Sequence, residues 1–214
     1  RVLLDGRSPK TPAGVPLVLP TEVAARLVAA EWATQGEFLD PATMPATRLA
    51  ATAIDRIPLA RAETADEIAR YAGSDSLCYF ADGPVSLIER QEADWAPWLA
   101  WADRELGVRL HRAEGIAHVT QPPESLARVR ELALELDDFS LTGLATAVGL
   151  FGSAILALAV QRGAEAGDIA FDLSRLDEAF QEDQWGVDVE AAERTAARRA
   201  EADLLDRWFE ALRS

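Results

Sequence analysis

The longest apolar pattern of the chain runs from Phe139 to Gln161 and contains no charged residue. About 20 apolar residues are enough to cross a bilayer, so the stretch is either a membrane span or a helix buried in a protein core. Small and hydroxyl residues such as Thr142, Gly149 and Ser153 recur along it, and amphipathic stretches elsewhere need an apolar surface to cover. The pattern therefore favours one core helix on which the rest of the chain packs.

The N-terminal part of the chain alternates short apolar runs with turn residues. Asp5-Gly6 separates Val2–Leu4 from Arg7–Thr11, which is typical of a β-hairpin, and Leu17–Leu19 is predicted to form a third short strand. Three short strands bury little surface alone, so they must pack on the amphipathic helices that follow. These helices are predicted over residues 21–34 and 45–57.

From Pro123 onward the spacing of the apolar residues is helical throughout. One helix is predicted between Asp168 and Trp185, and a last helix begins after Asp188. The core-facing residues of the first are Ile169, Leu173, Leu176 and Phe180. Those of the last helix are Val189, Ala192, Ala196, Ala200, Leu204 and Trp208.

This change from strand-bearing to purely helical sequence predicts a mostly helical α+β fold. We expect a small N-terminal α/β unit with a short antiparallel sheet over residues 1–60, followed by a helical bundle over residues 61–214. The boundary between the two domains falls between Pro58 and Thr64. The chain begins at Arg1 inside a strand pattern, so we expect its natural N-terminus to lie upstream.

The charge balance excludes some classes of partner. The formal net charge is −15 and the pI is about 4.5, which argues against binding to nucleic acid or to anionic membrane surfaces. A partner with a basic surface is compatible with it, although a solvated acidic face is the commoner reason for such charge. Cys78 is the only cysteine, so no intramolecular disulfide can form and a reducing compartment fits.

The sequence offers little that points to catalysis. It contains neither a Gly-x-Ser-x-Gly elbow nor a phosphate-binding loop with Gly-Lys-Ser/Thr. His111 and His118 are the only histidines, and they could join a metal site or activate Cys78 as a nucleophile. No third residue at ligand spacing accompanies them, so we expect no metal, no cofactor and no catalytic residue. A small enzyme that uses Cys78 with a histidine remains the alternative.

Acidic residues cluster near the end of the predicted helix between Asp168 and Trp185. On this helix, Glu178 and Glu182 face away from the apolar side, with Phe171 and Arg175 beside them. A solvated helix face explains the acids. Phe171 does not fit such a face, so it is either covered by another helix or available to a partner.

Five stretches together resemble a known family, and they follow its order along nearly the whole chain. They are LDGRSPKTPAG (4–14) with PLVLP (16–20), AAEW (29–32), DPATMPATRLAATAIDR (40–56), YAGSDSLCYFA (71–81) and RLDEAFQEDQWG (175–186). The sequence is similar to the assembly chaperones of the F-type ATP synthase, of mitochondrial and alphaproteobacterial type. These chaperones hold the alpha subunit of the catalytic head before it joins beta.

The resemblance implies a non-enzymatic chaperone that works without ATP and prevents aggregation of the unassembled alpha subunit. It also implies a small α+β unit followed by an orthogonal helical bundle. We expect a monomer that is not embedded in a membrane and that resides in the bacterial cytoplasm, or in the mitochondrial matrix of a eukaryote. A protein that uses residues 139–161 at a membrane is the second alternative.

The resemblance also suggests where the partner binds. The acidic position of the family's Leu-acid-acid-x-Phe-Gln motif falls on Asp177 and Glu178, and Trp32 matches its Glu-Trp signature. A large aromatic after an amphipathic stripe usually belongs to the core, so packing of the N-terminal unit is the favoured role of Trp32. We expect the acidic helix face to bind basic groups of alpha while apolar groups cover its exposed interface. The candidate partner-binding residues are Trp32, Phe171, Arg175, Asp177, Glu178, Gln181 and Glu182.

Overall fold

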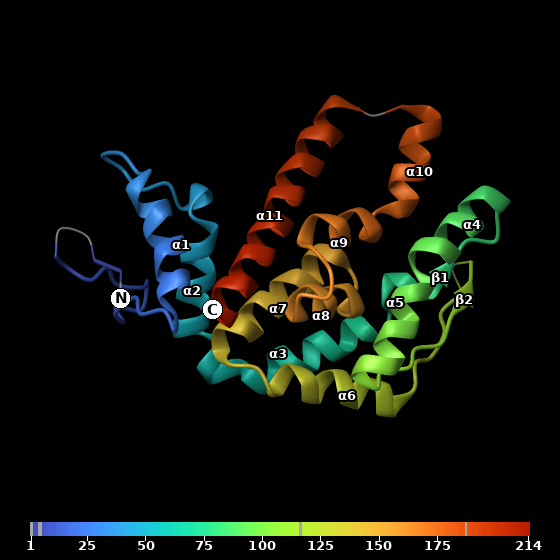
Figure 1. The fold of residues 1–214 in the computed structure, drawn as a ribbon, viewed down its shortest axis with the longest axis horizontal. Coiled ribbons are helices and arrows are strands. Elements are labelled where there is room, and N and C mark those ends of the chain that lie inside the picture. Colours follow the sequence, from blue (N-terminus) through green and yellow to red (C-terminus); the bar gives the residue numbers. More distant parts are fainter. Residues whose placement is uncertain (1, 4–5, 116, 187) are drawn as a thin grey trace.

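The computed structural model describes residues 2–3, 6–115, 117–186 and 188–214, and it is mostly helical (Figure 1). The α-helices are α1 (Glu22–Ala33), α2 (Pro45–Asp55), α3 (Ile57–Ala72), α4 (Val85–Asp94), α5 (Ala96–Trp101), α6 (Pro123–Leu134), α7 (Asp138–Phe151), α8 (Ala154–Arg162), α9 (Gly167–Ser174), α10 (Leu176–Trp185) and α11 (Val189–Arg213). Short helical turns are η1 (Pro41–Thr43), η2 (Ser76–Cys78) and η3 (Ala102–Leu106). The strands are β1 (Tyr79–Phe80) and β2 (Ala113–Glu114).

The prediction of a short antiparallel sheet at the N-terminus is wrong. The two named strands pair in parallel, with Tyr79 opposite Ala113, and they lie outside the N-terminal unit. Among the described N-terminal residues, Lys10 and Pro16 form an isolated antiparallel bridge, and Leu17–Leu19 forms no strand. Proline recurs at positions 9, 12, 16 and 20, and each proline lacks the N–H that a β-ladder needs. Leu4 and Asp5 of the predicted hairpin lie outside the described residues.

Side-chain carboxylates hold the N-terminal unit together. Glu31 on α1 accepts hydrogen bonds from the backbone N–H groups of Ala46 (2.7 Å) and Thr47 (2.8 Å), which caps the first turn of α2. Asp55 at the end of α2 accepts one from the Thr11 hydroxyl (2.6 Å). The division into two domains at residue 60 stays a prediction. The helix α3 runs across this point and bends at Ala60 (φ −130°, ψ 16°).

The charge-free stretch forms two helices, so the single core helix that we predicted is wrong. Gly152 ends α7 in the left-handed region (φ 65°), and the Ser153 hydroxyl caps α8 by accepting from the N–H of Leu156 (3.1 Å). Both helices are nevertheless largely buried, and α2, α3 and α11 pack around α7, as the apolar pattern predicts. Within the described ranges, no helix combines the length and the apolar character needed to cross a membrane.

A buried carboxylate joins this core to the middle of the chain. Asp75 is fully buried and accepts hydrogen bonds from the N–H groups of Ile155 (3.1 Å), at the start of α8, and Leu77 (3.2 Å), in η2. Desolvation raises the pKa of Asp75 to about 6, although these hydrogen bonds and one with Ser153 partly offset it. Leu77, Cys78 and Phe80 of the stretch YAGSDSLCYFA are buried with Asp75.

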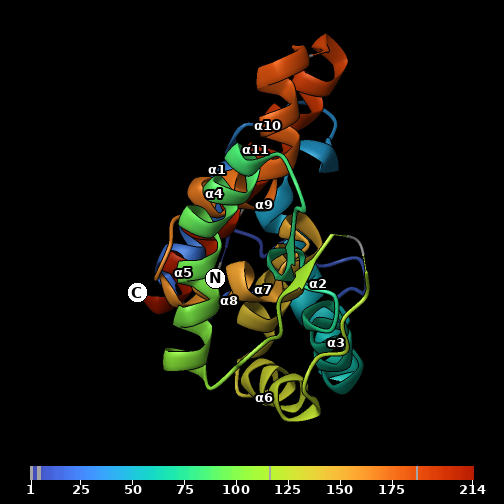
Figure 2. The same cartoon turned by 90° about the vertical axis from the view of Figure 1, so that its right-hand side faces the viewer.

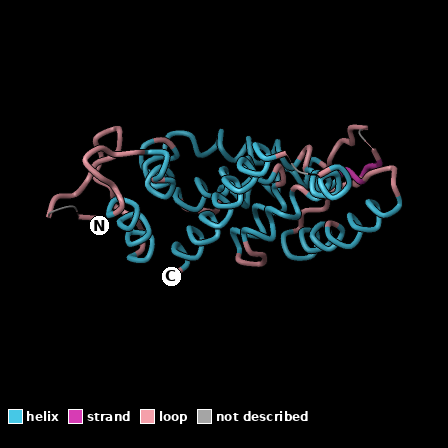
Figure 3. Tube along the Cα trace, turned by 90° about the horizontal axis from the view of Figure 1, so that it is seen from above, coloured by secondary structure: helices cyan, strands magenta, loops and turns pink. Residues whose placement is uncertain are grey.

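The last helix extends well beyond the body of the molecule. Its second half, residues 201–213, buries Leu204 and Trp208 as predicted, but its first half, residues 189–200, is mostly exposed and Val189 is 76% exposed. The side predicted to be apolar is not buried there, because it consists largely of alanine, whose burial gains little free energy. In Figures 1 and 2 this first half and α10 project together from the body, and we call them the arm. Seen from above, the N-terminal loops and the strands lie at opposite ends of an elongated body (Figure 3).

Candidate functional site

The predicted helix between Asp168 and Trp185 is broken at Arg175, whose backbone leaves the helical region (φ −122°, ψ 29°). The Ser174 hydroxyl donates to the carbonyl oxygen of Phe171 (2.7 Å), a local bond that competes with the helical ladder. The helical-wheel argument does not extend across this break. Ile169, which we predicted to face the core, is 44% exposed.

Phe171 is covered rather than available to a partner. Its side chain is 2% exposed, and the guanidinium carbons of Arg199 and Arg175 lie 5.6 and 6.0 Å from its ring centroid. A cation over an aromatic face adds to the apolar burial of the ring. The sequence left open whether Phe171 is covered or available to a partner, and in the structure it is covered. Phe171 therefore shares no exposed face with Glu178.

Asp177 anchors α10 to its neighbour α4. One of its oxygens accepts a hydrogen bond from Gln91 Nε2 (2.7 Å), and the fully buried Gln91 accepts in turn from the N–H of Ala81 (2.8 Å). Burial, more than the charge of Glu178, raises the pKa of Asp177, while the bond from Gln91 opposes this rise. The Trp95 indole adds a second link to this region through the Leu173 carbonyl (2.8 Å). The half-buried Asp177 is thus a structural residue as well as a candidate for binding.

The remaining candidates on α10 differ in whether they already have an ion-pair partner. Arg175 and Glu182 form a two-pronged ion pair (2.6 and 3.3 Å), partly buried, that ties the start of α10 to its second turn. Glu178 is exposed, as the sequence predicts for the solvent side of this helix, and Gln181 is exposed as well, whereas Glu182, predicted on the same side, is only partly exposed. Glu178 is therefore the acid on this helix best placed to meet a partner's cation.

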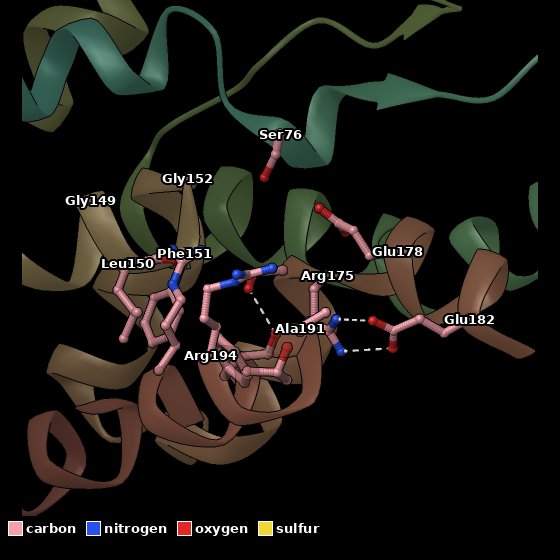
Figure 4. Close-up of a pocket in the computed structure, with 14 residues that line it drawn as sticks. Ser76, Gly149, Leu150, Phe151, Gly152, Arg175, Glu178, Glu182, Ala191 and Arg194 are labelled. Atoms are coloured by element: carbon pink, nitrogen blue, oxygen red, sulfur yellow. Dashed lines mark hydrogen bonds and ion pairs between the residues drawn. The ribbon is translucent and has the colours of Figure 1, made fainter. Parts of the chain in front are cut away.

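A cleft of about 570 Å³ lies between α10 and the first half of α11, with the turn between α7 and α8 as its floor (Figure 4). Glu178 and Glu182 stand on one wall, and Arg194 stands on the other. The Ser76 hydroxyl points toward the cleft. It is buried and has no hydrogen-bond partner among the described residues. The lining residues are Ser76, Gly149, Leu150, Phe151, Gly152, Phe171, Ser174, Arg175, Glu178, Glu182, Ala191, Arg194, Thr195 and Arg198.

Sequence reasoning missed this cleft, because its walls come from segments that are distant in the chain. Only the clustering of acids on α10 signalled one of the walls. Trp32, the remaining candidate, lies on α1, which is separated from α10 by α11 in Figure 1. It packs partly buried against the core, and its indole nitrogen is buried without a partner in the described part of the chain. The structure does not bring Trp32 together with the acids of α10.

The alternative nucleophile is poorly placed for chemistry. Cys78 is buried, and its burial together with the charge of Asp75 raises the pKa of the thiol, so the thiolate is disfavoured at neutral pH. His111 and His118 are exposed. The described ranges contain no group of three or more His, Cys, Asp or Glu side chains arranged to hold a metal ion.

Comparisons with known proteins decide the family. The family model of the ATP12 chaperone protein matches residues 1–103. The crystal structure of Atp12 from Paracoccus denitrificans is similar over 98% of this chain and 90% of its own, with 40% sequence identity and a TM-score of 0.92. The chain belongs to the ATP12 chaperone family.

Two further relatives agree with this assignment. The mitochondrial protein atp12 of Schizosaccharomyces pombe is 26% identical over 198 residues, which are 86% of this chain and 68% of that protein. The structure of a protein from Agrobacterium tumefaciens matches 98% of this chain and 79% of its own, with 40% identity and a TM-score of 0.92. The family resemblance inferred from the five stretches is confirmed. This ATP12 protein is an assembly chaperone of the F1-ATPase and not an enzyme, so the alternative based on Cys78 is wrong.

Proposed function

We propose that this chaperone binds the unassembled alpha subunit of the F-type ATP synthase and prevents its aggregation until alpha joins beta. Binding uses the cleft-facing side of α10, where Glu178 and Glu182 meet basic groups of alpha. The observation that supports this most is the exposed Glu178 on the wall of a 570 Å³ cleft in a chain of net charge −15. Opposite charges attract over about 10 Å at moderate salt, so the acidic wall also favours encounter with a basic surface.

The other candidate residues contribute to this site in different ways. Gln181 is exposed on α10 and can donate and accept hydrogen bonds to a bound chain. Arg175 and Asp177 fix the geometry of the wall through Glu182 and Gln91. Trp32 belongs to a separate part of the surface, and its role in binding is a second contact at most. The protein acts as a monomer in the bacterial cytoplasm or, in a eukaryote, in the mitochondrial matrix.

The proposal is tested by reversing one charge on the cleft wall. Glu178→Lys should weaken binding to purified, unassembled alpha by about tenfold or more and should leave more alpha aggregated during co-expression. The matched control is Glu63→Lys, which makes the same change of charge at an exposed position of α3, on the other side of the body from the arm. Wild-type affinity in Glu178→Lys, or equal losses in both variants, would exclude the assignment of this wall.

A further inference from the structure

The end of the arm presents large apolar side chains to solvent. Trp185 closes α10 and is 77% exposed, and Val189 opens α11 and is 76% exposed. Tryptophan is highly buried on average in folded proteins, and its side chain offers the largest apolar area of any residue. An indole exposed to this degree therefore contributes little to the stability of the fold.

The position of Trp185 on its helix relates it to the cleft. Glu178, Glu182 and Trp185 are spaced by four and then three residues, so they follow one another along the same face of α10. The first two line the cleft, and Trp185 therefore continues this wall at its outer end. On the opposite wall Ala191 and Thr195 are small and only partly exposed, which leaves room for an inserted side chain.

The surroundings of this apolar pair are acidic. Glu182 and Asp183 precede Trp185, and Asp188 and Glu190 flank Val189. Three of these acids already have arginine partners, since Glu182 pairs with Arg175, Asp183 with Arg90 and Glu190 with Arg194. Arg175, Arg194 and Arg198 also line the cleft, so the cleft acid that offers an unpaired charge among the described residues is Glu178. A partner segment that places a large apolar side chain here thus gains most if Lys or Arg stands beside that side chain.

We propose that Trp185 and Val189 form an apolar anchor for one segment of the unassembled alpha subunit, in which a large apolar residue is adjacent to Lys or Arg. This inference rests on the proposed function and specifies what the cleft recognises. The apolar residue packs on the indole at the mouth of the cleft, and the basic residue reaches Glu178 inside it. The anchor then supplies affinity that salt does not screen, whereas the acidic wall supplies the salt-sensitive part.

The experiment compares binding of purified, unassembled alpha to four variants at low and at high salt. Trp185→Ala should lose about thirtyfold in affinity, as truncation of an aromatic that a partner buries does, and Trp185→Phe should recover part of it. Leu59→Ala is the matched control, since Leu59 is 90% exposed on α3, and it should bind as the wild type does. The loss in Trp185→Ala should persist at high salt, whereas that in Glu178→Lys should shrink.

The outcomes separate this inference from the proposed function. If Glu178→Lys weakens binding but Trp185→Ala equals Leu59→Ala, the anchor is overturned and the acidic wall stands. If the wild-type protein does not bind alpha at all, both fall. A loss in Trp185→Ala that vanishes at high salt would also contradict the anchor, because burial of an indole does not depend on charge screening. Circular dichroism of each variant confirms that the fold is retained.

Discussion

The two halves of α11 belong to one continuous helix but meet different surroundings. Residues 201–213 bury Leu205, Trp208 and Phe209 in the core, where the Trp208 indole donates to the Phe139 carbonyl (3.2 Å). Residues 189–200 are mostly exposed, and Arg198 reaches down to the Leu150 carbonyl (2.8 Å). The first group fixes the helix in place, and the second carries it out to form a wall of the cleft. Packing thus decides the fold at one end of the helix and leaves the other end mostly exposed to solvent.

The largest expected difference between core and arm concerns pH. Asp75 takes up a proton near pH 6 in the folded protein but only near 3.8 when unfolded, so the folded state binds more protons between these values. Its contribution to stability therefore rises as the pH falls from about 7 to about 4, by on the order of 3 kcal/mol. Chemical denaturation of the wild type and of Asp75→Asn across this range measures the contribution. The free energy of unfolding of the wild type should gain on that of the variant as the pH falls. A difference that does not change with pH would contradict it.

A smaller effect is expected where α7 meets the buried half of α11. A Cβ at Gly143 would lie 2.8 Å from Phe209 and 2.9 Å from Trp208, whereas one at Gly149 meets nothing within 4 Å. Gly143→Ala should therefore lower the free energy of unfolding by about 1–3 kcal/mol through overpacking. Gly149→Ala, on the same helix, should raise it by about 0.5–1 kcal/mol through helix propensity. Thermal unfolding of the pair decides the matter, and changes of the same sign would rule out this close contact.

The smallest effect is expected within the arm itself. Ala196→Gly lowers helix propensity by about 1 kcal/mol at an exposed position of the first half of α11. Because this half makes few core contacts, it should open before the rest, and global unfolding should change by less than about 0.5 kcal/mol. Hydrogen exchange should instead be about fivefold faster in residues 190–200. If the global free energy of unfolding fell by the full cost of about 1 kcal/mol, the arm would unfold together with the core.

Local signals in the sequence predicted much of the helical framework. Thr21, Asp188 and Gly163 act as the caps that their types suggest, and the apolar stretch from Phe139 lies in the core. The breaks at Gly152 and Arg175 were not predicted, because the apolar pattern runs on through both of them. Such breaks depend on which partners the backbone finds after folding.

The candidate site could be predicted only in part. Exposure of Glu178 follows from helical periodicity, whereas Glu182, placed on the same face by that periodicity, is partly buried against Arg175. The bond between Gln91 and Asp177 joins residues 86 positions apart, and no local pattern indicates it. The exposure of Trp185 is likewise set by where α10 ends relative to the body, and composition alone favours burial of such a residue.

The continuity of α11 has a mechanical consequence. Its 25 residues make a rod of about 37 Å that Trp208 and Phe209 hold in the core at one end, while the other end follows directly on α10 in the chain. No loop interrupts it, so a load applied at Val189 is carried by bending stiffness directly to the clamped end. The width of the cleft is then governed by how far a single beam deflects.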